Sequence, residues 1–144
     1  MTKYEEMCEQ AYNEQIDIKN VDVPVPGMGA VYIRAKGKKC IFIKRNATTE
    51  ENSCLLAEEL GHHFTGSDRV LMYDCPEDWK DEARARRWAH ARLITPEQIE
   101  TAARSTDDIY EIADVLSVTV DFLIEAINDY VTKGLWAYCP ALWW

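Results

Sequence analysis

The segment CLLAEELGHHFTG, residues 54–66, constrains the chain most, because a helical pattern here carries side chains of the kinds that bind metal ions. Glu58 and His62 are four residues apart, so both lie on one face of a helix and can bind the same ion. Glu59 is rotated by about 100° and can instead contact a water molecule on that ion. The His-Glu-x-x-His helices of zinc peptidases have the same division between two ligands and a general base.

Two positions outside this pair extend the pattern. Gly61 costs a helix about 1 kcal/mol relative to alanine, so its place before His62 predicts that another element passes close by. Glu82 stands near the start of KDEARARRWAHARLI, a segment whose alanines predict a second, tightly packing helix. We expect Glu82 in the first turn of that helix, where it could supply a third ligand.

The hydrophobic pattern predicts a helix, a small antiparallel sheet and then a helical bundle, which is an α+β fold. Thr48 or Thr49 can cap the helix that carries the motif, and Thr95-Pro96-Glu97-Gln98 is typical of another helix start. We expect a single domain, in which the predicted parts are helix plus sheet (1–47), metal-site helices (48–94), a C-terminal helical part (95–134) and an apolar tail (135–144).

Composition excludes several classes of protein. The 25 acidic and 16 basic residues give a net charge of −9, which argues against direct nucleic-acid binding, since such affinity depends on clustered Lys and Arg. No apolar run approaches the roughly 20 residues that span a bilayer, so we expect no membrane association. Five cysteines without a Cys-x-x-Cys pair indicate free thiols in a reducing cytoplasm.

The segment IADVLSVTVDFLIEAI has the pattern of a helix-turn-helix, with its turn at residues 117–119. A recognition helix needs basic or amide side chains that face the DNA groove, whereas this one offers Asp121, Glu125 and Asp129. We therefore interpret the segment as a packing or partner-binding module, and direct DNA regulation is a weaker hypothesis.

The motif and the alanine-rich segment together resemble the ImmA/IrrE family of metallopeptidases, which occur in bacterial mobile elements, prophages and stress responses. The resemblance spans roughly residues 3–130. It implies a zincin-like core and cleavage of a helix-turn-helix repressor protein. The positions that carry it are Ala57, Glu58, Glu59, Leu60, Gly61 and His62, followed by Glu82, Ala85, Arg86, Trp88, Ala89, Leu93 and Ile94.

The chain departs from the family pattern at Glu58, which replaces the first metal-binding histidine. The resemblance then implies an ion held by Glu58, His62 and Glu82, with Glu59 as the general base. The expected cofactor is zinc, although two carboxylates and one histidine form a harder ligand set that moves the preference toward manganese or iron.

Other interpretations stay open at this point. His63 and His90 are possible accessory residues of the site, but we expect His63 to form hydrogen bonds nearby and His90 to be structural. A thiolate ligand at Cys54 is conceivable, and a buried core residue is the simpler reading. For function, the alternative to an endopeptidase is a non-catalytic antirepressor that binds and sequesters a repressor.

Overall fold

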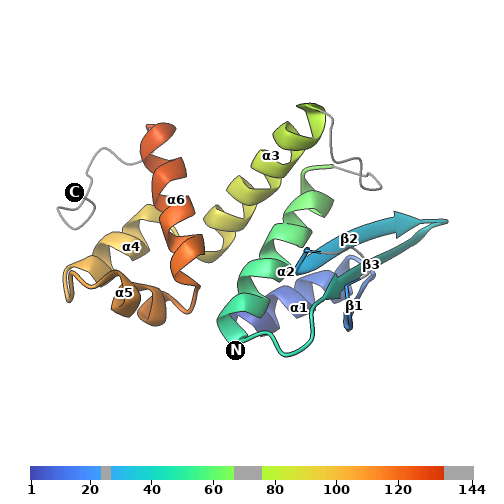
Figure 1. Cartoon of the computed structure of the whole chain (residues 1–144), viewed down its shortest axis with the longest axis horizontal. Coiled ribbons are helices and arrows are strands. Elements are labelled where there is room, and N and C mark those ends of the chain that lie inside the picture. Colours follow the sequence, from blue (N-terminus) through green and yellow to red (C-terminus); the bar gives the residue numbers. More distant parts are fainter. Residues whose placement is uncertain (24–26, 67–75, 135–144) are drawn as a thin grey trace. The chain divides into compact units, whose positions relative to one another are not determined.

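The computed structural model describes residues 1–23, 27–66 and 76–134, so the predicted apolar tail lies outside the described residues. The chain divides into two compact units, residues 1–89 and 90–144. The elements in chain order are α1 (Lys3–Asn13), β1 (Ile16–Asn20), β2 (Ala30–Ala35), β3 (Lys38–Ile43), α2 (Thr49–Phe64), α3 (Pro76–Leu93), α4 (Pro96–Ala103), α5 (Ile109–Leu116) and α6 (Val120–Thr132) (Figure 1).

The three strands form a sheet in the order β1-β3-β2. Strands β2 and β3 form the predicted antiparallel hairpin, in which Tyr32 lies opposite Ile41. The sequence predicted a wholly antiparallel sheet. Strand β1 instead pairs in parallel with β3, so the sheet is mixed. The reason is that β1 pairs with β3, the second strand of the hairpin, and β3 runs in the same direction as β1. Among the described residues, β2 is therefore an edge strand.

Threonine caps fix the starts of the helices on both sides of the site region. The Thr48 side chain accepts a hydrogen bond from the main-chain N–H of Glu51, and the Glu51 side chain accepts one from the N–H of Thr48. Thr95 and Gln98 form the same reciprocal pair at the start of α4. Each pair satisfies two helix-end donors. The sequence predicted the arrangement at Thr95, and of the two candidate caps of α2 the structure has Thr48.

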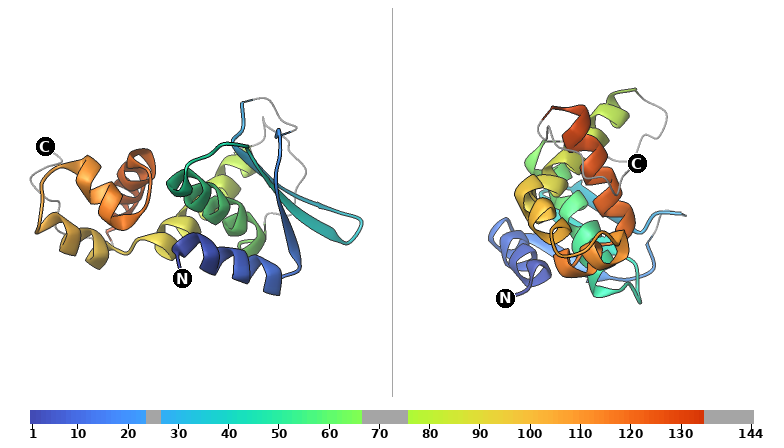
Figure 2. Two further views of the ribbon diagram at one scale, coloured as in Figure 1. Left: turned by 90° about the horizontal axis from the view of Figure 1, so that it is seen from below. Right: turned by 90° about the vertical axis from the view of Figure 1, so that its left-hand side faces the viewer.

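Helix α2 is the central element of the N-terminal unit, since it packs against α1, β2 and β3. Its apolar face carries Leu56, Ala57 and Leu60, all fully buried, and Met7 of α1 and Ile41 of β3 are buried in the same unit. The end of the β2–β3 hairpin reaches beyond the helices of this unit in two views (Figures 1 and 2). The buried face of α2 includes part of the motif, since Ala57, Glu59, Leu60 and Gly61 are all buried.

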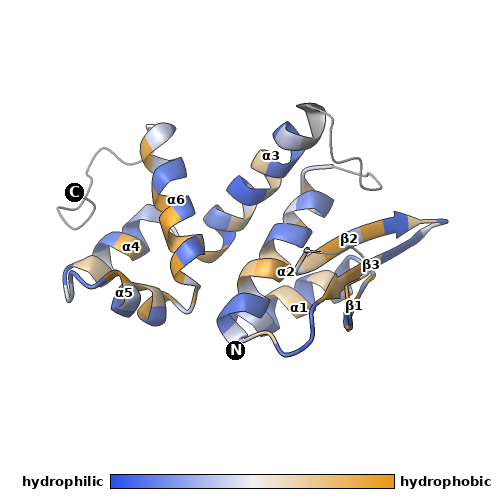
Figure 3. Ribbon diagram, viewed as in Figure 1, coloured by the Kyte–Doolittle hydropathy of each residue, from blue (hydrophilic) through white to orange (hydrophobic). Residues whose placement is uncertain are grey.

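The C-terminal unit contains the predicted helix-turn-helix pattern, α5 and α6. Ser117 ends α5 in the left-handed conformation, with φ of 58°, and Thr119 caps α6. Apolar and polar residues alternate along both helices (Figure 3). Asp and Glu are the only charged residues from 105 to 132, and Tyr110, Val115, Ile124 and Val131 are exposed. In the described part of the chain, no helix has the length and hydropathy needed to cross a membrane.

Candidate active site

The last turns of α2 bring His62 against Glu82 of α3. The Nε2 atom of His62 lies 2.9 Å from Oε2 of Glu82, and the His62 side chain is 14% exposed. Two of the three predicted ligands therefore converge, although 20 residues separate them in the chain. Helix α3 begins at Pro76, so Glu82 lies beyond the first turn in which the sequence analysis placed it. The predicted start of this helix was wrong, because the alanine-rich pattern used to place it begins several residues after Pro76.

Gly61 explains how α2 and α3 approach so closely. A Cβ atom at this position would lie 2.3 Å from the carbonyl oxygen of Ala85 and 3.0 Å from its Cα. No residue other than glycine fits this contact without displacement of a backbone, which confirms the predicted close approach. The contact sets the spacing between the two helices at the point where His62 meets Glu82.

Glu59 is the only carboxylate among the buried polar side chains of the described residues, and it is 8% exposed. The pKa of its carboxyl is raised from 4.5 to about 7, mainly because of burial, and the negative charge of Glu82 contributes in the same direction. His62 and a hydrogen bond from the main-chain N–H of Tyr32 act in the opposite direction and lower the pKa. A carboxyl group that titrates near neutral pH can accept a proton in one step and release it in the next.

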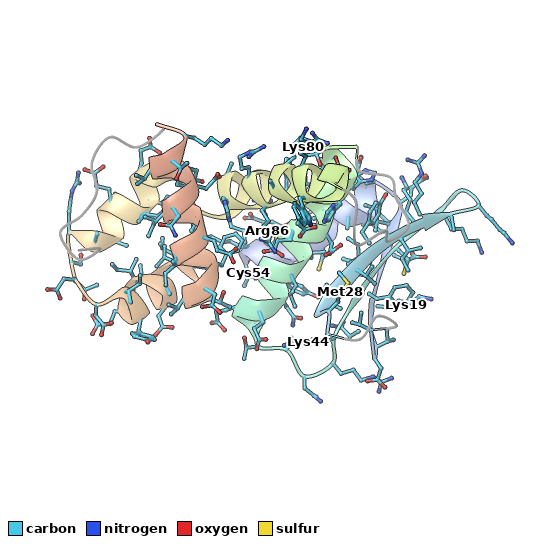
Figure 4. The ribbon with its side chains drawn as sticks, turned by 45° about the horizontal axis from the view of Figure 1, so that its top comes forward. Lys19, Met28, Lys44, Cys54, Lys80 and Arg86 are labelled. Atoms are coloured by element: carbon cyan, nitrogen blue, oxygen red, sulfur yellow. The ribbon has the colours of Figure 1, made fainter. Side chains whose placement is uncertain are left out.

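Arg86, labelled in Figure 4, contributes positive charge to the same pair of helices. Its Nε atom lies 3.5 Å from Oε1 of Glu82, one helical turn earlier on α3. The two oxygens of Glu82 thus face different partners, His62 and Arg86.

Glu58 follows the expected helical geometry but is not brought into a complete ligand cluster. It is half-buried on α2, four residues before His62. Among residues 1–23, 27–66 and 76–134, no group of three or more His, Cys, Asp or Glu side chains is arranged to hold a metal ion. The converging nitrogen and carboxylate of His62 and Glu82 are chemically suited to zinc. Participation of Glu58 stays a prediction.

His63 belongs to a different network from His62. Its Nδ1 atom is 2.9 Å from the hydroxyl of Tyr32, and its Nε2 atom is 2.8 Å from Oε1 of Glu14. Its ring also packs edge-on against Phe64. The expectation of local hydrogen bonding is confirmed, but neither partner was predicted. No sequence signal links these residues, because Glu14 follows α1 and Tyr32 lies on β2.

His90 and Cys54 have contacts typical of structural residues. His90 is buried, its Nδ1 atom lies 3.4 Å from Oδ2 of Asp129, and its ring packs against Phe122 and Tyr130. These partners all belong to the C-terminal unit. Cys54, also labelled in Figure 4, is buried on α2 with 6% exposure, as expected of a core residue.

Comparison with protein families gives one match of direct relevance. The family model described as the IrrE N-terminal-like domain, peptidase family M78, matches residues 13–128. Searches of curated proteins and of solved structures gave no match. The matched range includes Glu59, His62 and Glu82, together with the helices and strands that position them. The chain therefore belongs to the IrrE N-terminal-like family of metallopeptidase-like domains, the ImmA/IrrE family.

Proposed function

We propose that the protein is a metal-dependent endopeptidase whose substrate is a helix-turn-helix repressor of a prophage or mobile element. The observation that carries the proposal is the buried Glu59, with a pKa of about 7, beside the His62–Glu82 pair. Membership of the family supports the peptidase class, and the repressor as substrate follows from the resemblance described above.

In this proposal, Glu58, His62 and Glu82 would hold the ion. When bound, a zinc ion supplies a Lewis acid that lowers the pKa of water and polarises a carbonyl group. Manganese or iron would supply similar chemistry to this carboxylate-rich set.

Glu59 supplies the proton transfers. Its carboxylate accepts a proton from the attacking water, and the resulting carboxylic acid delivers that proton to the nitrogen of the departing amine. Burial suits it to both steps because a pKa of about 7 leaves both forms populated near neutral pH. The main-chain N–H of Tyr32 donates a hydrogen bond to this carboxylate.

The alternative function is sequestration of a repressor without cleavage. Two observations favour it: Glu58 replaces the family's first histidine, and the exposed residues of α5 and α6 combine apolar side chains with negative charge only. Such a surface complements a basic protein partner, and it opposes direct contact with DNA.

One experiment distinguishes the two functions. The protein is incubated with the repressor encoded beside its gene, with zinc or with a chelator, and Glu59→Gln serves as the variant that lacks only the base. Metal-dependent cleavage that Glu59→Gln abolishes supports the enzyme. Stable binding without cleavage, unchanged by the chelator, supports sequestration and rejects the peptidase.

A further inference from the structure

Tyr32 forms two hydrogen bonds that join strand β2 to helix α2. Its main-chain N–H donates to the carboxylate of Glu59, and its hydroxyl lies 2.9 Å from Nδ1 of His63. Glu59 and His63 are four residues apart and therefore lie on one side of α2. A single residue of the edge strand thus contacts the same helix at two successive turns.

The contacts continue from His63 to the end of α1. Glu14 accepts a hydrogen bond from Nε2 of His63 at 2.8 Å. An ionised carboxylate can only accept, so Nε2 carries the proton, and in the neutral ring Nδ1 is the acceptor for the Tyr32 hydroxyl. The side chains of His63 and Glu14 are 12% and 38% exposed, and Tyr32 is 6% exposed. Every donor in this chain of contacts therefore has an acceptor.

We propose that Glu14, His63 and Tyr32 are positioning residues, whose hydrogen bonds keep the main-chain N–H of Tyr32 on the carboxylate of Glu59. The proposal rests on the proposed peptidase function for its catalytic consequence. It assigns the second histidine of the motif a role distinct from metal binding. His63 holds the Tyr32 ring, and the ring holds the strand at the level of Glu59.

The alternative is that the three side chains only stabilise the fold. Glu59 would then keep its position when the hydroxyl of Tyr32 is removed, because the ring would still fill the same buried space. If the three residues position Glu59, removal of the Tyr32 hydroxyl should change the NMR signals of residue 32 and Glu59. The change should be larger than that caused by removing the hydroxyl of a buried tyrosine that is not linked to Glu59.

Tyr130 offers that matched control. Its hydroxyl donates to the carbonyl oxygen of Ile94 at 2.6 Å, and both residues belong to the C-terminal unit. Tyr32→Phe and Tyr130→Phe each delete one hydroxyl from a buried ring and one intramolecular hydrogen bond. Tyr32 donates from its main-chain N–H to Glu59, whereas the hydroxyl of Tyr130 donates to Ile94.

The first readout needs no catalytic activity. In metal-free protein, we expect Tyr32→Phe to move the amide proton signal of residue 32 upfield and to shift the side-chain carboxyl carbon of Glu59, whereas Tyr130→Phe leaves both unchanged. Glu14→Ala should produce a smaller shift of the same sign at residue 32. Glu14→Gln should restore it, because an amide oxygen also accepts from His63. Signals that respond equally to the two tyrosine variants would overturn the proposal.

The second readout is catalysis by the zinc-loaded protein on the repressor. We expect Tyr32→Phe to lower kcat by roughly tenfold, with KM and zinc affinity unchanged, because misplacement of a catalytic group lowers the rate. An unchanged kcat in an active parent would overturn the positioning role. If the parent shows no cleavage, the proposed peptidase function fails, and the residue 32 signals alone decide whether the contacts position Glu59.

Discussion

Neutralisation of Glu59 by Glu59→Gln should stabilise the metal-free protein at high pH but not at low pH. Burial raises the folded-state pKa of this carboxyl from 4.5 to about 7. Such a group contributes stability that is fully present below pH 4.5 and is lost as the pH rises through 7. A difference of about 2.5 pKa units corresponds to about 3 kcal/mol in the free energy of unfolding.

Glutamine has similar size and retains an oxygen that can accept from the N–H of Tyr32, but it never ionises. We therefore expect the variant and the parent to have similar stability at pH 4, and the variant to be more stable by up to about 3 kcal/mol at pH 8. The measurement is urea unfolding of both proteins in the presence of a chelator across this range.

Glu125→Gln is a suitable control, because it removes one carboxylate from an exposed position of α6. We expect little difference from the parent at any pH, since water solvates the exposed carboxylate in both folded and unfolded states. If the difference for Glu59→Gln is also independent of pH, Glu59 is hydrated in the folded protein and the reasoning from its burial is refuted.

Three further substitutions test the geometry of the site. Gly61→Ala should destabilise the protein by about 2 kcal/mol or more despite the better helix propensity of alanine, because its Cβ would collide with the carbonyl of Ala85; urea unfolding that shows a gain would contradict this contact. His62→Ala should lose zinc, as measured by elemental analysis after dialysis. Full zinc occupancy in this variant would show that His62 is not a ligand and that zinc binds at other residues. Glu58→His should tighten zinc binding in a competition titration if residue 58 is a ligand, and unchanged affinity would make Glu58 a bystander.

Local chemistry predicted much of the fold. The caps at Thr48 and Thr95 and the turn at Ser117 depend on residues close in sequence, so the helix starts and the turn between α5 and α6 were predicted near their observed places. The partner of β1 was not predictable in this way. Its parallel pairing with β3 depends on which strand of the hairpin it meets, and the apolar pattern of Ile16 and Ile18 is the same in either case.

The site shows the same division between local and distant contacts. Gly61 carried a direct signal, because a glycine inside a helix needs a packing reason. The helical rotation of about 100° per residue predicted different surroundings for Glu58 and Glu59, and Glu58 is half-buried whereas Glu59 is buried. The contacts of His63 with Tyr32 and Glu14 could not be predicted from the sequence. They join the end of α1, strand β2 and helix α2, and the packing of the core sets the positions of these elements without any sequence motif.

Among the strands that the structure describes, β2 lies at the edge of the sheet, and this position gives the Glu59 contact a second consequence, for solubility. An edge strand presents unpaired N–H groups to which a strand of another molecule can bind, and this is a route to aggregation. Here the Tyr32 N–H already has an acceptor on α2, and the exposed end of the hairpin carries Arg34, Lys36 and Lys38, whose like charges repel a second copy. The hydrogen bond to Glu59 and the positive charges at the end of the hairpin are both features that oppose edge-to-edge association of strands.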